Sequence, residues 1–283
     1  MLVQARRRAL TPIFYGSLYS QVICLYSCYY KLYILRAFSV WGCCLVDIET
    51  IKEKTSIKAF NDLLPLIKKS NVIGLGTGST IKYFIQELLR EKVYQEKILV
   101  VSSIDTLLFI KKYEPTIMVA DISSIDKVDI YVDGADEVSK NLDLVKGRGA
   151  AFLREKMIAL RAKYKVYLID YTKYNGENYL FKKPVPVEVT VHSLPWILNK
   201  LRLNDLFRPI IRMGTAKDGP IISDNGNIII DLYPLKPIER PNEVDRTLRS
   251  INGVIETGIF PRDLVDRVYI GYEDKILVLK GTK

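Results

Sequence analysis

The feature that most constrains this sequence is the alternation of short apolar runs with amphipathic helical segments, which starts at Asp47 and continues toward the C-terminus. The apolar run 71–75 predicts a buried strand. Apolar residues then follow at i, i+3, i+4 and i+7 from Ile81, which predicts a helix that begins near Ser79. Further strands are predicted at 97–102, 117–120, 128–132 and 165–169, and further helices at 105–113 and 150–163. This order predicts an α/β fold with a mostly parallel sheet flanked by helices.

The pattern changes after Phe181. Residues 185–191 alternate as a half-buried strand does, and Pro184 and Pro186 indicate that this strand lies at a sheet edge. The Asp-Asn-Gly sequence at 224–226 predicts a tight hairpin, because Asn-Gly tolerates positive φ angles. The hairpin arms are predicted at 221–223 and 227–231, other strands at 210–213 and 254–260, and helices at 194–203 and 242–251. Together they give the β-α-β-β-α-β order of a ferredoxin-like α+β domain.

The first 47 residues differ from the rest in charge and cysteine content. Five basic residues and no acidic residue precede Asp47, so about half of the net charge of +10 lies there. The four cysteines also lie there, at positions 24, 28, 43 and 44, and their spacing does not resemble a zinc site. Residues 9–30 carry no charge. Three interpretations stay open: a signal sequence or membrane anchor, an organelle transit peptide, or a gene-model artefact.

We therefore predict three parts: an N-terminal extension at 1–47, a catalytic domain at 48–180 and 257–283, and an inserted small α+β domain at 181–256. The body is only mildly basic, which suits an anionic small-molecule substrate. No Lys/Arg cluster interleaves with aromatic residues in the body, so we predict no nucleic-acid partner. The chain is expected in the cytoplasm, or in a plastid or mitochondrion if the extension is a targeting segment. Membrane association is expected only if the extension is an anchor.

Polar motifs follow three of the predicted strands, at 76–80, 133–137 and 170–173. The carboxyl ends of parallel strands share one edge of a sheet, where ligands bind, so we expect these motifs to converge. The Gly-Thr-Gly-Ser-Thr loop at 76–80 lacks the lysine of a P-loop and the third glycine of the dinucleotide fingerprint, which argues against a nucleotide. Taken singly, each motif also fits a plain turn with a helix cap, and Glu155 alone fits a surface position.

Six motifs in order resemble the type A ribose-5-phosphate isomerase family: GLGTGST (74–80), DGADE (133–137), KGRGA (146–150), REK (154–156), PVPVEV (184–189) and DNGN (224–227). The resemblance runs from about residue 48 to the C-terminus. It implies a Rossmann-like catalytic domain with the small domain inserted, and a homodimer or homotetramer. It also implies an isomerase that interconverts ribose 5-phosphate and ribulose 5-phosphate in the pentose phosphate pathway, with no cofactor.

The resemblance also assigns site residues. It implies catalytic roles for Glu155 as the base and for Asp133, Asp136 and Lys146. The substrate-binding residues that it implies are Thr77, Gly78, Ser79, Thr80, Gly134, Ala135, Gly147, Arg148, Gly149 and Lys173. Many family members have glycine where this chain has Arg148, and the sequence leaves open whether that side chain points away from the substrate or contacts it.

Interconversion of an aldose and a ketose moves a proton between adjacent carbons through an enediolate, which needs a base and donors to the oxyanion. A metal-assisted hydride shift would need a ligand cluster, and we predict no metal, because the only histidine, His192, is expected to be structural. Two rival functions are a non-catalytic sugar-phosphate sensor and a membrane-anchored binding protein. Residues 1–47 do not read as the helix-turn-helix that the sensor needs, and the intact catalytic set argues against the anchored protein.

Overall fold

The computed structural model describes residues 47–203, 205–216 and 218–281, and these belong to one compact unit. The predictions for the N-terminal extension therefore lie outside the described residues, apart from Asp47. The division of the rest into domains at 180/181 and 256/257 stays a prediction. Among the described residues, no helix combines the length and the apolar character needed to cross a bilayer.

A seven-stranded sheet forms the larger part of the fold, with the order β14-β13-β7-β4-β1-β2-β3. Its strands are β1 (Val72–Leu75), β2 (Ile98–Val101), β3 (Val119–Ala120), β4 (Val128–Asp133), β7 (Ala162–Asp170), β13 (Arg267–Gly271) and β14 (Ile276–Lys280). All neighbours pair in parallel except β13 and β14. This confirms the predicted α/β fold with a mostly parallel sheet.

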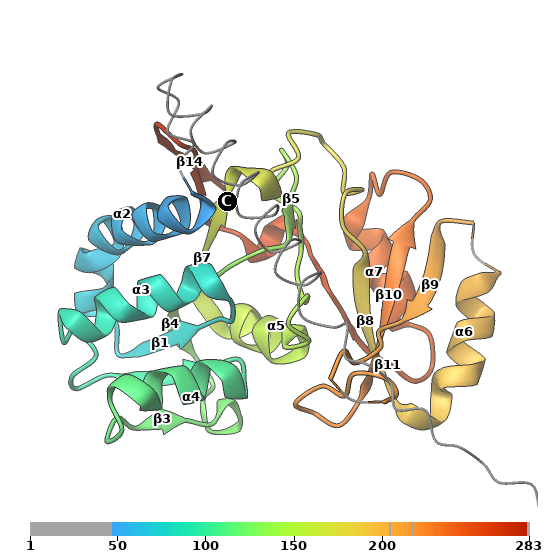
Figure 1. Cartoon of the computed structure of the whole chain (residues 1–283), viewed down its shortest axis with the longest axis horizontal. Helices are drawn as coiled ribbons and strands as arrows, with labels where there is room; N and C mark the ends of the chain where they lie inside the picture. Colours follow the sequence, from blue (N-terminus) through green and yellow to red (C-terminus); the bar gives the residue numbers. More distant parts are fainter. Residues whose placement is uncertain (1–46, 204, 217, 282–283) are drawn as a thin grey trace, which may run out of the picture. The chain divides into compact units, whose positions relative to one another are not determined.

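Helices cover both faces of this sheet. Successive strand residues point to opposite faces, so each face carries apolar side chains that a helix must bury. On β4, Ile130 and Val132 belong to one core cluster and Tyr131 to the other. The first cluster is completed by α2 (Ile48–Lys69), α3 (Ser79–Arg90) and α4 (Ile104–Tyr113), and the second by α5 (Phe152–Arg161). Helices α2 and α3 lie side by side (Figure 1). The sequence analysis did not identify α2, although its buried Ile51, Thr55, Ala59, Leu63 and Ile67 recur at helical spacing.

A second, antiparallel sheet has the order β11-β8-β10-β9 and is accompanied by two helices. The strands are β8 (Val185–Val189), β9 (Phe207–Ile211), β10 (Ile228–Pro234) and β11 (Val254–Thr257), and the helices are α6 (Leu194–Arg202) and α7 (Pro241–Arg249). In Figure 1, α6 lies beside β9 at the outer side of this sheet. The predicted β-α-β-β-α-β order is present.

The prediction that residues 185–191 form an edge strand is wrong. β8 pairs with β10 on one side and β11 on the other, and all its residues are buried. A proline has no N–H to donate to the neighbouring segment. The inner strand tolerates Pro186 because the carbonyl opposite it, Gly258 O, has another donor. Gly258 N–H donates to Pro186 O, while Gly258 O accepts from Lys146 N–H at 2.8 Å. The proline therefore leaves the carbonyl of Gly258, in the segment beside β8, with a hydrogen-bond donor.

Two strand boundaries also differ from prediction. The single strand expected at 254–260 divides at Gly258 into β11 and β12 (Ile259–Phe260), and β12 joins a separate small sheet with β5 (Glu137–Val138) and β6 (Leu144–Val145). A side chain at Gly258 would collide with the Lys146 carbonyl oxygen, so the close crossing requires glycine. The turn at 224–226 is present, with Gly226 at φ +82°, but its first arm is only an isolated bridge between Ile222 and Ile228.

Candidate active site

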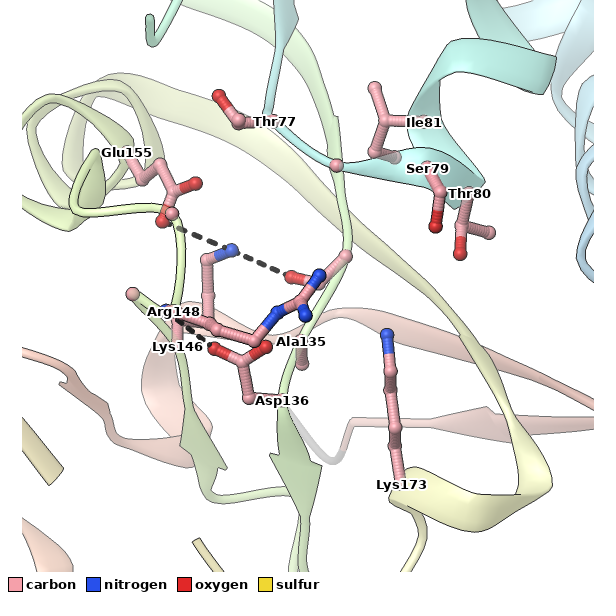
Figure 2. Close-up of a pocket in the computed structure, with 14 residues that line it drawn as sticks. Thr77, Ser79, Thr80, Ile81, Ala135, Asp136, Lys146, Arg148, Glu155 and Lys173 are labelled. Carbon is pink, nitrogen blue, oxygen red and sulfur yellow. Dashed lines mark hydrogen bonds and ion pairs between the residues drawn. The ribbon is translucent and has the colours of Figure 1, made fainter. Parts of the chain in front are cut away.

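A polar pocket opens where the motif loops converge, beyond the carboxyl ends of β1 and β4 (Figure 2). Its empty space, counted together with the open solvent at its mouth, is about 520 Å³. The pocket lining consists of Thr77, Gly78, Ser79, Thr80, Ile81, Gly134, Ala135, Asp136, Lys146, Gly147, Arg148, Gly149, Glu155 and Lys173. Every residue that the sequence assigned to the site lies in this lining except Asp133, and Ile81 is the one lining residue that was not assigned.

The loop between β1 and α3 presents backbone donors to the pocket. Gly78, at φ +127°, precedes the first turn of α3 and supplies no side-chain cap, so this turn keeps N–H groups that an anion can bind. The Thr77 hydroxyl is occupied elsewhere: it donates to Ser103 Oγ at 2.7 Å and lies 2.9 Å from Ser102 Oγ. The Thr77 N–H is occupied as well, by Asp133 Oδ1 at 3.1 Å, so the donors left for an anion are the N–H groups that follow Gly78.

Asp133 lies behind the pocket wall and is fully buried at the end of β4. Its carboxylate accepts from Gly134 N–H at 2.7 Å and from Thr77 N–H at 3.1 Å, and it also accepts from the Tyr131 hydroxyl. Its Oδ2 lies 2.7 Å from Lys146 Nζ. Gly76 allows this arrangement, because a Cβ there would overlap the Asp133 carboxyl group. The geometry makes Asp133 the counter-ion of Lys146, and its predicted catalytic role stays a prediction.

Lys146 brings a buried positive charge to the pocket. Its Nζ donates to Gly134 O at 2.6 Å and lies 3.2 Å from Glu155 Oε2. Burial by itself would lower the pKa of Lys146, but the carboxylates of Asp133 and Glu155 outweigh it and hold the pKa above its ordinary value. Lys146 is therefore a fixed cation, suited to stabilising negative charge on a substrate oxygen.

Glu155 is 4% exposed and lies in the first turn of α5, with its carboxylate facing the pocket (Figure 2). Its Oε2 has no hydrogen-bond partner among the described residues. Burial is the main cause that raises the pKa of Glu155; the charge of Asp133 adds to it and Lys146 opposes it, which leaves the pKa at about 8. A buried carboxylate with a raised pKa and a single lysine as its polar side-chain contact is a proton acceptor poised near neutral pH. The surface interpretation of Glu155 is therefore wrong.

Loop 147–149, which carries the cation of Arg148, also lines the pocket. Arg148 N–H donates to Asp136 Oδ2 at 2.9 Å, which ties the loop to the DGADE motif. The Arg148 side chain extends into the pocket and lines it, so the question that the sequence left open is answered in favour of a pocket position (Figure 2). Arg212, which the sequence analysis did not identify, donates through Nη1 to the carbonyls of Gly147 and Arg148. No local motif marks Arg212, because its partners lie far away in the sequence.

Lys173 faces the pocket from the 3₁₀ turn Tyr171–Lys173, with its Nζ 3.9 Å from Asp170 Oδ2 (Figure 2). Burial lowers the pKa of Lys173, and the charges of Asp170 and Asp136 oppose that change. A wider hollow of about 1290 Å³ adjoins the pocket; it shares Arg148 and Lys173 with it and adds Lys52 and Lys183, which the sequence analysis also missed. The entrance to the pocket is therefore rich in cations.

Two further observations concern metals and histidine. Within the described ranges, no group of three or more His, Cys, Asp or Glu side chains could hold a metal ion. His192 is exposed in the short 3₁₀ helix Val191–Ser193 and is not among the pocket-lining residues.

A proton-accepting carboxylate, a fixed lysine cation and a helix N-terminus around one small hollow define an acid–base enzyme for a small anionic substrate. Comparison with known proteins makes the assignment specific. Residues 98–275 match the family described as "Ribose 5-phosphate isomerase A (phosphoriboisomerase A)". The chain therefore belongs to the ribose 5-phosphate isomerase A family, and it is a ribose-5-phosphate isomerase.

Relatives and solved structures support this assignment over most of the chain. The chain is 41% identical over 234 residues to "Ribose-5-phosphate isomerase A" of Pyrococcus horikoshii, covering 81% of this chain and 99% of that protein. It is 34% identical over 240 residues to "Ribose-5-phosphate isomerase" of Dictyostelium discoideum, covering 83% and 100%. Among solved structures, a D-ribose-5-phosphate isomerase in complex with phospho-erythronic acid matches with a TM-score of 0.75 at 38% identity, over 83% of this chain and 100% of that one. The Plasmodium falciparum ribose 5-phosphate isomerase matches with a TM-score of 0.73 at 29% identity, over 83% and 100%.

Proposed function

We propose that Glu155 is the base that carries the proton in the interconversion of ribose 5-phosphate and ribulose 5-phosphate. The carboxylate takes the proton from C2 of the open-chain aldose, which leaves an enediolate, and returns it to C1, while the hydroxyl proton moves from O2 to O1. The observation that carries this proposal is the buried Glu155 carboxylate, which lines the pocket and has Lys146 Nζ, 3.2 Å from Oε2, as its one polar side-chain contact within the described part of the chain. A positioned base with a pKa near the working pH is the most effective proton carrier.

In this proposal, the ammonium group of Lys146 stabilises the oxyanion of the enediolate. Lys146 Nζ lies 3.2 Å from the base, so a substrate oxygen next to the reacting carbons comes within reach of the same ammonium group. Asp133 holds that lysine in place from behind at 2.7 Å. A cation fixed in advance costs no reorganisation when charge develops, which is why this placement favours the transition state over the ground state.

The substrate phosphate binds at the cationic side of the pocket, between the N-terminus of α3 and Lys173. The free N–H groups after Gly78 and the ammonium of Lys173 supply donors and positive charge. The solved relative in complex with phospho-erythronic acid supports a phosphorylated ligand of this size. Asp136 lines the same pocket and assists the transfer of oxygen-bound protons during ring opening.

The homodimer or homotetramer and the cytoplasmic location, or an organelle if residues 1–47 target the chain, are further parts of the proposal. They rest on the family resemblance and on the sequence of the extension. Light scattering of the purified full-length chain tests the first, with a monomer as the contradicting result. Fractionation of cells tests the second.

The proposed function is tested by incubating the purified full-length chain with ribose 5-phosphate and following ribulose 5-phosphate by a coupled assay. We expect turnover that a chelator does not reduce. Loss of turnover with chelator would contradict the proton-transfer mechanism. Binding of ribose 5-phosphate without turnover would instead favour the sugar-phosphate sensor.

A further inference from the structure

The loop that carries Arg148, one of the pocket cations, is held by an arginine that follows a strand of the antiparallel sheet. Arg212 directly follows β9 and crosses to loop 147–149, where its Nη1 lies 2.9 Å from Gly147 O and 3.0 Å from Arg148 O. The other side of the guanidinium group faces Asp231 on β10: Nε donates to Oδ2 at 2.8 Å, and Nη2 donates to Oδ1. The side chains of Arg212 and Asp231 are only 14% and 13% exposed, so this contact is well shielded from solvent.

The two carbonyls that Arg212 binds decide where the loop N–H groups point. A trans peptide places its C=O and the following N–H on opposite sides. When the carbonyl of Gly147 turns toward Arg212, the N–H of Arg148 turns the other way, and it is found on Asp136 Oδ2 at 2.9 Å. By the same geometry, the carbonyl of Arg148 on Arg212 turns the N–H of Gly149 away from the antiparallel sheet, and Gly149 lines the pocket.

The backbone of this loop also needs a restraint. Gly147 has φ +107° and Ala150 has φ +58°, a left-handed conformation that is costly for alanine. Such conformations persist only where the surroundings over-determine them. Arg212 supplies two of the hydrogen bonds that do so, because a planar guanidinium group can bridge two carbonyls and a carboxylate at once.

We propose that Arg212 is a positioning residue for catalysis: it holds loop 147–149 so that the Arg148 N–H stays on Asp136 and the Gly149 N–H points toward the pocket. This inference rests on the proposed function of the pocket. It assigns part of the catalytic geometry to a residue that does not line the pocket around Glu155, and it makes the Arg212–Asp231 pair the link between the antiparallel sheet and the pocket.

The test uses three variants of the full-length chain: Arg212→Lys, Arg212→Ala and Asp231→Asn. Arg208→Ala is the matched control, since Arg208 is an exposed arginine of β9 that stacks over the Tyr233 ring at 5.4 Å and has no contact with the loop. For each variant, kcat is measured per site that binds phospho-erythronic acid, which removes the contribution of unfolded protein. The Michaelis constant and the melting temperature are recorded beside it.

We expect kcat per binding site to fall about 10-fold in Arg212→Lys and about 100-fold in Arg212→Ala, because small displacements of positioned groups have effects of that size. The Arg208→Ala control should match the wild type. Asp231→Asn should give a smaller fall, and the double variant Arg212→Ala/Asp231→Asn should lose no more than Arg212→Ala alone, since both act through one contact.

If Arg212→Ala does not fold, Arg212→Lys and Asp231→Asn carry the test. A kcat per binding site within twofold of the wild type in the folded variants would overturn the proposal, as would a fall of the same size in Arg208→Ala. A wild-type chain that binds phospho-erythronic acid but does not isomerise ribose 5-phosphate would overturn the proposed function instead.

Discussion

Two buried lysines in this protein each lie between two carboxylates, yet their surroundings differ. Lys146 contacts Asp133 and Glu155 at 2.7 and 3.2 Å, and Lys156 contacts Asp245 and Glu256 at 3.0 and 2.8 Å. Both ammonium groups lie over the ring of Phe260, at 5.5 and 5.2 Å from its centroid. One aromatic residue therefore contacts two lysine-centred ion clusters, and the Lys156 cluster also includes Arg249, 3.4 Å from Asp245 and 3.8 Å from Glu256.

The difference lies in how completely the carboxylates are satisfied. Around Lys156, Asp245 also accepts from Thr257 Oγ1 and Glu256 accepts from Thr257 N–H at 2.8 Å. Around Lys146, Glu155 Oε2 is buried without a hydrogen bond to any described residue. A fully paired cluster joins helices and strands, whereas a carboxylate that contacts only one lysine keeps its capacity to accept a proton. The comparison indicates that the Lys156 cluster serves structure and the Lys146 cluster serves catalysis.

The largest expected effect separates the two glutamates. Glu155→Gln should lower kcat by about three orders of magnitude, because it removes a general base, while binding of phospho-erythronic acid is largely kept. Glu256→Gln, the matched variant in the other cluster, should keep kcat per folded molecule within about threefold, because Glu256 does not line the pocket. Near-normal turnover by Glu155→Gln would remove the assignment of the base.

Replacement of Lys146 should mainly change kcat, and replacement of Lys156 should mainly change the free energy of unfolding. Lys146→Gln should lower kcat about 100- to 1000-fold, the effect of losing one oxyanion donor. Lys156→Gln should leave kcat per folded molecule nearly unchanged but reduce the free energy of unfolding by about 3 kcal/mol, because two buried carboxylates then keep only the more distant Arg249 as counter-ion. Denaturant unfolding and steady-state kinetics on both variants check this. Equal kinetic losses in the two would break the comparison.

A smaller effect is expected at the phosphate side. Lys173→Ala should raise the Michaelis constant about 10-fold with little change in kcat, as expected for the loss of one charged hydrogen bond to substrate. Lys200→Ala is the control, since Lys200 lies on α6 and stacks over Trp196. An unchanged Michaelis constant for Lys173→Ala would exclude it from the phosphate site.

The smallest effect concerns stability and pH. Burial, aided by Asp133, places the pKa of Glu155 at about 8, above the ordinary 4.5. Between these values the folded chain binds more protons than the unfolded chain, so this group makes stability fall as pH rises. The free energy of unfolding of the wild type should therefore decline from pH 6 to pH 8.5 by at least about 1 kcal/mol more than that of Glu155→Gln. Equal declines would argue against a raised pKa.

How far the sequence predicts this protein depends on how local each cause is. The helix α3 and its Gly78 loop were predicted, because apolar spacing and glycine positions lie within a short stretch. The edge position of β8 was wrong, because the carbonyl opposite Pro186 is satisfied by Lys146, which directly follows β6 and lies far away in the sequence. Arg212 was missed because the carbonyls that it contacts, those of Gly147 and Arg148, also lie far from it in the sequence. Contacts between distant segments decide these cases, and one sequence contains no direct sign of them.

The parallel sheet and the positions of the pocket residues were predictable for a related reason. Parallel strands end at one edge, so motifs that follow such strands converge without any knowledge of side-chain contacts. What could not be predicted is how strongly each carboxylate is held. The family resemblance implied catalytic roles for both Asp133 and Glu155, but only the fold shows that Asp133 accepts from several donors besides Lys146, whereas Glu155 contacts Lys146 alone among the polar side chains of the described residues.

Whether Glu155 takes the proton from C2 is measured by following the hydrogen at C2 itself. Ribose 5-phosphate that carries deuterium at C2 is incubated with the wild type, Glu155→Gln and Glu256→Gln, and loss of the label from C2 is measured by NMR. We predict that the wild type and Glu256→Gln remove the deuterium at similar rates and that Glu155→Gln removes it about three orders of magnitude more slowly. Removal of the C2 deuterium by Glu155→Gln at the wild-type rate would contradict the account.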